Sequence, residues 1–190
     1  MLSDQVKELI KKSRIVSFED WQHPSEVIAI FQQADNEGKY LTDAEIAKIK
    51  AIVPSLSQSL ERGKVLRDNV SEIVSQARAV VLDANPGILE PGGGLYPPMR
   101  AEACWRDFWH FLRCISYGIS GESVNYTSDR GLSYMEQLYR ELEVPLDAMV
   151  LGLEQLKVFS LRQFKSDEQG DLEPYFDRLI ESMKKFSFVS

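Results

Sequence analysis

The chain has 190 residues, of which 44% are hydrophobic and 27% are charged. That length suits one large domain, and the composition supplies enough apolar residues for a core. A chain disordered throughout and a disulfide-rich scaffold are therefore excluded. Asp and Glu number 29 against 22 Lys and Arg, which gives a net charge of −7. Because nucleic acids are held mainly through their phosphates, we expect no nucleic-acid partner.

Neither a membrane span nor a secretory signal is expected. No apolar stretch approaches the roughly 20 residues that a spanning helix needs, and charges interrupt the first 16 residues, MLSDQVKELIKKSRIV. The two cysteines, Cys104 and Cys114, lie ten positions apart on one predicted helix, about 15 Å along its axis. They cannot form a disulfide with each other. A reducing compartment fits two free thiols, and Cys114 is expected to be a small core residue.

Apolar residues recur at spacings of three and four almost throughout the chain, which predicts helices and no strands. The first helix is marked by the apolar positions of Val6–Ile10. A break follows at His23–Ser25, and a second short helix is expected over Val27–Ala34. Both helices are short and apolar on one face, so we expect those faces to pack against another chain.

A longer helical region begins at a capping box. The hydroxyl of Thr42 can cap the backbone while the Glu45 carboxylate reaches back, as this motif requires. The helical pattern then continues to about Leu82, with Pro54 and Gly63 as predicted bends or boundaries.

The second half of the chain opens with a loop rich in proline and glycine between Asn85 and Pro98. Four helices are expected after it: Met99–Ile119, Ser128–Leu142, Pro145–Gln163 and Asp171–Lys185. The sequence therefore predicts an all-α fold with seven or eight helices in one domain.

The helix after the loop carries the side chains that are best suited to bind or react with a ligand. Cys104, Asp107, Phe108 and Phe111 share one face, and Arg100 lies one turn earlier on the same side. A thiol, a carboxylate and two rings on one face would suit a pocket for a flat ligand. The same spacing also fits an ordinary core helix, in which cysteine is simply a small buried side chain.

Three motifs in this region occur in a fixed order. Glu90–Tyr96 reads EPGGGLY and is similar to a PGGNAY loop, Cys104–Asp107 reads CWRD and matches CxRD, and Leu112–Ile119 reads LRCISYGI and is similar to LRxxTYGI. Together they resemble the phycobiliproteins, the light-harvesting proteins of cyanobacteria and red algae. Gly94 stands where β subunits of this family carry a methylated asparagine, which favours an α-type chain.

Flanking segments extend the resemblance to about Val27–Phe186. The segments Ala34–Leu41 and Glu173–Asp177 resemble the start and the end of the allophycocyanin α group, which includes the α-B type. The family implies a globin-like domain, here residues 27–190, preceded by an extension of residues 1–26. That extension adds an interface or a linker contact, or it is a passive addition; the sequence leaves these alternatives open.

The resemblance implies specific roles in binding a linear tetrapyrrole, phycocyanobilin. Cys104 matches the cysteine that forms a thioether to ring A, and Asp107 matches the aspartate that accepts hydrogen bonds from the pyrrole N–H groups. Arg106 matches an arginine that binds a propionate, as a planar guanidinium suits a carboxylate. Tyr117 and Tyr139 match tyrosines near the pigment, although either can also serve only for packing.

Other residues are assigned less directly. Arg100 is expected to be a second propionate partner, on helical spacing alone. Trp105, Phe108, Trp109 and His110 make the helix unusually aromatic, and we expect them either to tune the colour of the pigment or to contact another subunit. No catalytic residue and no metal site are predicted. A third interpretation is His110 as a haem ligand in a globin-like fold, but the CxRD motif on the same helix explains more of the sequence.

The function implied by the resemblance is light harvesting without enzyme activity. The chain is expected to join an allophycocyanin β-type subunit in a ring-shaped hetero-oligomer, within the phycobilisome core and its linker proteins. That assembly lies on the cytoplasmic or stromal face of the thylakoid membrane. A red-shifted terminal emitter is the expected specialisation, and the alternative is a non-antenna relative that acts as a bilin carrier, a sensor or a structural subunit.

Overall fold

A computed structural model of the chain describes residues 3–186. Within that range the fold is all-α, as predicted, and the only strand-like pairing is an isolated bridge between Val16 and Thr127. The elements are α1 (Asp4–Lys12), α2 (Ser25–Glu37), α3 (Asp43–Ile52), a short 3-10 turn (Pro54–Leu56), α4 (Ser57–Ala84), α5 (Pro98–Ser120), α6 (Asp129–Glu141), α7 (Leu146–Leu161) and α8 (Ser166–Lys184).

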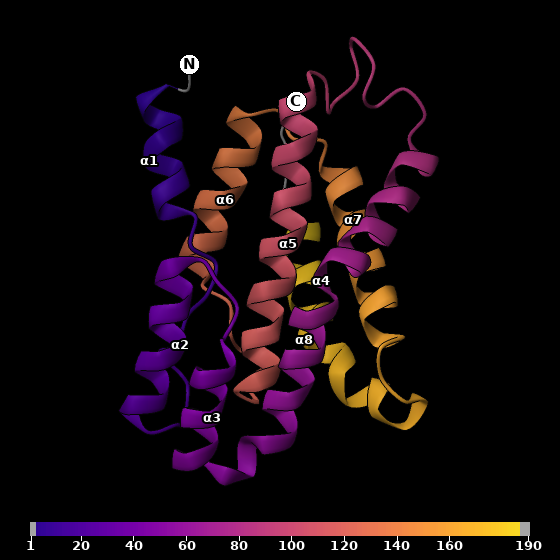
Figure 1. The fold of residues 1–190 in the computed structure, drawn as a ribbon. Coiled ribbons are helices and arrows are strands. Elements are labelled where there is room, and N and C mark those ends of the chain that lie inside the picture. The colour runs from indigo at the N-terminus through magenta and orange to yellow at the C-terminus, as the bar shows by residue number, and fades with distance from the viewer. Residues whose placement is uncertain (1–2, 187–190) are drawn as a thin grey trace.

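Helix α5 forms the centre of the molecule (Figure 1). Helix α4 packs along it and also against α7, and α7 in turn packs against α8. On the other side, α1 lies along α6. Every residue from Phe111 to Ser120 is buried, so the second half of α5 is covered all round, whereas its first half keeps a polar side. The candidate residues of CWRD lie in that first half.

The ends of the helices follow local sequence signals. The capping box of Thr42 and Glu45 is present as predicted, and the Ser128 hydroxyl accepts from the amide of Gly131 at the start of α6. Helix α8 begins at Ser166, five residues before the predicted start. Its first turn, SDEQG, contains no apolar residue and therefore gives no periodic signal.

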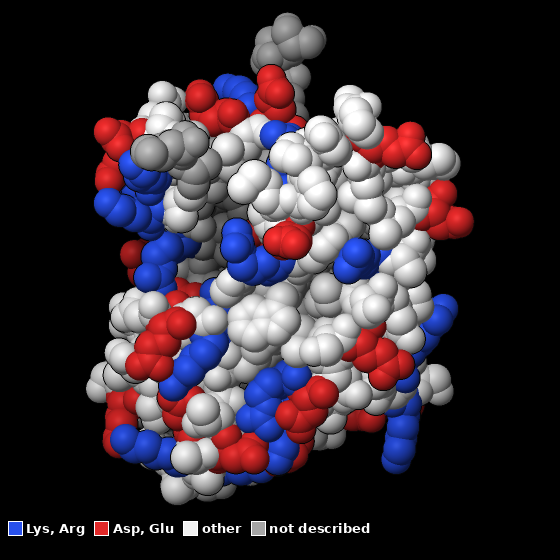
Figure 2. Space-filling view, turned by 45° about the horizontal axis from the view of Figure 1, so that its top comes forward, with Lys and Arg blue, Asp and Glu red and all other residues white. Residues whose placement is uncertain are grey.

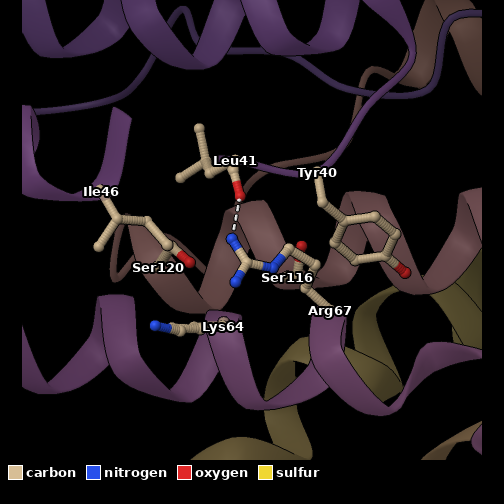
Figure 3. A pocket seen from close by; sticks show the side chains of 8 residues that line it. Tyr40, Leu41, Ile46, Lys64, Arg67, Ser116 and Ser120 are labelled. Atoms are coloured by element: carbon tan, nitrogen blue, oxygen red, sulfur yellow. Dashed lines mark hydrogen bonds between the residues drawn. The ribbon is translucent and has the colours of Figure 1, made fainter. Parts of the chain in front are cut away.

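Gly63 is not a helix boundary, because α4 is continuous through it. The glycine instead allows α4 to approach α5, since a Cβ at this position would lie 1.9 Å from the Ser120 Oγ. Beside this contact is a cavity of about 10 Å³, large enough for a single water (Figure 3). Arg67 donates to the Leu41 carbonyl there at 2.8 Å, which ties α4 to the start of α3.

The predicted extension shares the core of the domain. Ile15 and Trp21 belong to the same buried cluster as the helices, and the indole of Trp21 lies against Gly121, where a Cβ would come within 2.2 Å of the ring. A backbone hydrogen bond also ties the extension to the domain, since the Ser128 amide donates to the Ile15 carbonyl at 2.7 Å. The first two residues of the extension and the last four of the predicted domain lie outside the described residues.

Most apolar residues of the first two helices are buried within this chain. Val6 and Leu9 are covered on the side where α1 lies along α6, and Val27 and Phe31 are fully buried. Phe31 packs against the Trp21 ring at 4.9 Å between centroids. The expectation of a contact with another chain is therefore wrong for these four residues, because the segment of residues 13–24 lets them fold inward. It stays a prediction for Ile10, which is 48% exposed.

Acidic and basic side chains are interspersed on the face shown in Figure 2, and among the residues described there no broad basic surface gathers. That distribution agrees with the negative net charge of the chain. A search of residues 3–186 for a helix that is both long and apolar enough to cross a bilayer finds none.

Candidate functional site

Helix α5 begins where the turn-rich loop ends. Pro97 is extended at the N-cap and Pro98 occupies the first helical position, where its missing N–H and its fixed φ are compatible with a helix start. From there the helix places Cys104 toward the core and Asp107 on the flank that faces α6. Arg106 points to the exposed side of the same turn.

Cys104 is buried, with 4% of its surface exposed. Burial raises the pKa of its thiol to about 12; the nearby Asp107 acts in the same direction, and Arg100 opposes it. The thiol is therefore protonated at neutral pH in this closed form. A ligand as large as a tetrapyrrole reaches the sulfur only if the surrounding side chains move.

Asp107 is bonded to Tyr139 of α6. The Tyr139 hydroxyl donates to the Asp107 Oδ2 at 2.8 Å, and Tyr139 itself is buried. Burial raises the pKa of Asp107 to about 6, while the hydrogen bond from Tyr139 and the charge of Arg106 act in the opposite direction. The structure thus brings Cys104, Asp107 and Tyr139 together from two helices, and only one of the two carboxylate oxygens is held by Tyr139.

Arg100 is committed to the backbone. Its Nε donates to the Gly94 carbonyl at 3.1 Å and its Nη2 to the Glu143 carbonyl at 2.7 Å. It therefore ties the glycine-rich loop to the turn between α6 and α7, a contact that helical spacing could not reveal. Arg106, in contrast, is exposed, and no carboxylate lies within 4 Å of it among the ion pairs of the described residues.

Tyr117 belongs to a separate network at the other end of α5. Its hydroxyl donates to the Lys39 carbonyl and accepts from the Arg113 Nη1 at 2.8 Å. Arg113 is buried and forms an ion pair with Asp35 at 2.9 Å. The structure therefore does not place the Tyr117 hydroxyl with the Asp107–Tyr139 pair. Asp35 lies in the segment Ala34–Leu41 and Arg113 in the LRCISYGI motif, but no sequence signal predicts that the two form an ion pair.

The four side chains of α5 that the sequence suggests for colour tuning, Trp105, Phe108, Trp109 and His110, lie in different environments. Trp105 is partly buried and stacks under Arg78 of α4 at 5.2 Å, whereas Trp109 packs edge-on against Tyr40 at 4.9 Å. Both rings thus lie away from the α6 flank that holds Asp107. Phe108 is fully buried against α7, where a Cβ on Gly152 would lie 1.9 Å from the ring.

His110 takes part in the Arg113 network rather than in the Cys104 group. Its Nδ1 accepts from the Arg113 Nε at 3.2 Å. Burial, helped by the charge of Arg113, lowers the pKa of His110 to about 4, so the imidazole is neutral. Cys114 is buried in the core, as predicted, and both cysteines are free thiols. No cluster of metal-ligating side chains occurs among residues 3–186.

Comparison with known proteins gives the family. The sequence model of the phycobilisome protein family matches residues 29–183, most of the chain. The chain belongs to the phycobilisome protein family. It is an allophycocyanin α-like phycobiliprotein and a light-harvesting subunit of the phycobilisome. Phycobiliproteins bind linear tetrapyrroles as antenna pigments and are associated with the thylakoid surface.

Individual relatives agree on the subgroup. The allophycocyanin α-B chain of Cyanidium caldarium is 35% identical over 152 residues, which cover 80% of this chain and 93% of that relative. The allophycocyanin α chain of Mastigocladus laminosus is 31% identical over 144 residues, covering 76% and 90%. The subunit α-B of Synechocystis sp. is 29% identical over 159 residues, covering 84% and 99%. These matches cover nearly the whole of each relative.

Proposed function

We propose that this chain is a pigment-carrying antenna subunit in which Cys104 holds phycocyanobilin as a thioether. The observation that supports it best is the grouping of the Cys104 thiol with the Asp107–Tyr139 pair in a chain of this family. When bound, the tetrapyrrole supplies the absorption of light. Its attachment is an addition of S–H across a carbon–carbon double bond, with sulfur on one carbon and the proton on the other, so it needs no oxidant or reductant.

The donor set fits such a ligand. The second oxygen of Asp107 is not taken by Tyr139, and a carboxylate there would accept hydrogen bonds from pyrrole N–H groups and favour their protonated form. Arg106 is exposed and pairs with no carboxylate among residues 3–186, so its guanidinium is available for a propionate. We assign Arg100 to holding the glycine-rich loop rather than to a propionate, since two backbone carbonyls already occupy it.

The attachment site is tested with two matched cysteine variants. The full chain, expressed with phycocyanobilin and the means to attach it, is compared as Cys104→Ser and Cys114→Ser. We expect pigment that survives denaturing electrophoresis in the wild type and in Cys114→Ser, but not in Cys104→Ser. Pigment retained by folded Cys104→Ser under denaturing conditions would place the thioether elsewhere.

We further propose assembly with an allophycocyanin β-type subunit into a ring within the phycobilisome core, in contact with linker proteins at the thylakoid surface. The support is the similarity to allophycocyanin α and α-B chains. Since Val27 and Phe31 are buried in this chain, the contact with a partner is expected to use other surfaces. Native purification of the tagged chain without any other phycobiliprotein subunit would contradict this assembly.

A red-shifted terminal emitter is the specialisation that we propose within this function, supported by two relatives of the α-B type. The test is emission from the chain assembled with an allophycocyanin β subunit, compared with an ordinary allophycocyanin α chain in the same partner. Emission at the same or a shorter wavelength would reject the specialisation. Trp105→Leu and Trp109→Leu then show whether either ring affects the colour. Phe108 is expected to act through packing, and His110 through its hydrogen bond with Arg113.

A further inference from the structure

Phe186 is the last residue of the chain that the structure describes. It follows α8, three positions beyond residue 183, where the match to the phycobilisome protein family ends. Its ring is nevertheless buried, with 8% exposed, and it packs edge-on against Tyr139, with 6.4 Å between the ring centroids and an angle of 85°. A residue after the end of α8 therefore contacts a member of the candidate site.

That contact leads directly to the carboxylate. Tyr139 donates from its hydroxyl to the Asp107 Oδ2 at 2.8 Å, so Phe186, Tyr139 and Asp107 form a continuous series from the end of the chain to α5. The other titratable groups that face Asp107 are Cys104 and Arg106, both on its own helix. Tyr139 is the only one of these groups that a neighbouring element supplies within the described residues.

We propose that Phe186 is a positioning residue of the tetrapyrrole site, which holds the ring of Tyr139 so that its hydroxyl stays bonded to Asp107. The edge of one aromatic ring against the face of another favours a defined orientation, which limits rotation of the Tyr139 side chain. The hydroxyl is then kept on Oδ2, and the other oxygen of Asp107 is kept for the ligand. The last described residue of the chain thus helps to set the state of the carboxylate that meets the pigment.

The role of Phe186 at a tetrapyrrole site rests on the proposed function. Its effect on the protonation of Asp107, however, can be measured in the protein without pigment. The hydrogen bond from Tyr139 favours the ionised form of Asp107. Loosening Tyr139 therefore makes the carboxyl hold its proton more tightly. Removal of the whole Phe186 ring would also admit water to Asp107, and hydration of the carboxylate lowers its pKa. The informative change is therefore Phe186→Leu, which keeps an apolar side chain over the site.

The test is a carbon NMR titration of the Asp107 carboxyl in the full pigment-free chain. Tyr139→Phe measures the full effect of the hydroxyl, and Phe186→Leu is expected to shift the protonation equilibrium in the same direction, by about threefold. The double variant is expected to shift it no further than Tyr139→Phe alone, because Phe186 acts through the hydroxyl. Phe159→Leu, whose ring lies on α7 against Arg162, serves as the control and is expected to leave the titration unchanged.

Two results would overturn the proposal: a midpoint in Phe186→Leu equal to that of the wild type, or a double variant in which the two shifts simply add. Either is read without pigment, so it is independent of whether Cys104 carries one. If Phe186→Leu fails to fold, Phe186→Tyr, which keeps the ring, is compared with Phe186→Met, and only the second is expected to move the midpoint. Loading the same variants with phycocyanobilin tests the proposed function separately, because a wild type that takes no pigment rejects that function and leaves the titration result standing.

Discussion

Asp35 and Arg113, 78 positions apart in the sequence, form an ion pair at 2.9 Å in which both side chains are about nine-tenths buried. Arg14, from the segment before the shared domain, approaches the other oxygen of the same carboxylate at 2.6 Å. The two arginines differ in their surroundings, since 46% of the Arg14 side chain is exposed, against 9% for Arg113. One aspartate thus joins the start of the chain to its central helix.

The difference in burial predicts unequal effects on stability. Arg113→Ala leaves Asp35 charged and poorly solvated, so we expect a loss of about 3–5 kcal/mol in the free energy of unfolding. Arg14→Ala removes a partner that water largely replaces, and we expect a loss below about 1 kcal/mol. Urea denaturation of both variants measures the two losses, and equal values would mean that Asp35 is more exposed than the structure shows.

The raised pKa of Asp107 predicts a dependence of stability on pH. Its pKa rises from 3.8 to about 6 on folding because of burial, so the folded chain holds this proton more tightly than the unfolded chain. The contribution of Asp107 to stability therefore falls as the pH increases from about 4 to about 6, and above that it stays low. The fall should amount to about 2–3 kcal/mol.

Asp107→Asn isolates this effect, because the amide oxygen can still accept from Tyr139 while the charge is absent. We expect the free energy of unfolding of the variant, relative to the wild type, to be about 2–3 kcal/mol higher at about pH 7.5 than at about pH 4. Urea unfolding of both proteins at the two pH values provides the comparison. A constant difference between them across this range would show that Asp107 is ionised in the folded chain well below pH 6.

Gly121→Ala tests the docking of the extension. The backbone of Gly121, with φ −94 and ψ 5, accommodates alanine, but the new methyl would lie 2.2 Å from the Trp21 ring. We expect a loss of about 1–3 kcal/mol from this overpacking. Gly170→Ala is the matched control, because no described residue outside its own stretch of helix places an atom within 4 Å of its Cβ position. In a helix this change should stabilise by about 0.5–1 kcal/mol. Thermal unfolding of both variants gives the comparison.

Arg100→Ala is expected to loosen the glycine-rich loop. The guanidinium holds the carbonyls of Gly94 and Glu143 at the two sides of the α5 start, and hydrogen bonds from charged groups are among the stronger ones. Limited proteolysis should therefore cut the loop between residues 85 and 97 several times faster in the variant than in the wild type. Arg106→Ala, which removes an exposed guanidinium from the same helix, should leave the rate unchanged, and a similar acceleration in both would assign the effect to charge alone.

The sequence alone determines the helical character, most helix boundaries and the grouping of Cys104 with Asp107. Helix periodicity fixes which side chains share a face of one helix, and caps such as Thr42 and Glu45 act within a few residues. Periodicity does not reveal the start of α8, because its first turn is polar. It also does not show that Gly63 lies within one continuous helix, because the reason for this glycine is the close approach of Ser120 on a neighbouring helix.

Only the tertiary structure decides which elements meet at each face. It bonds Asp107 to Tyr139, commits Arg100 to two backbone carbonyls and joins Tyr117 to Arg113. It also buries Trp21 and brings the ring of Phe186 to the site. These contacts join residues far apart in the sequence, and they depend on how closely whole helices approach. The period of one helix carries no information on that distance.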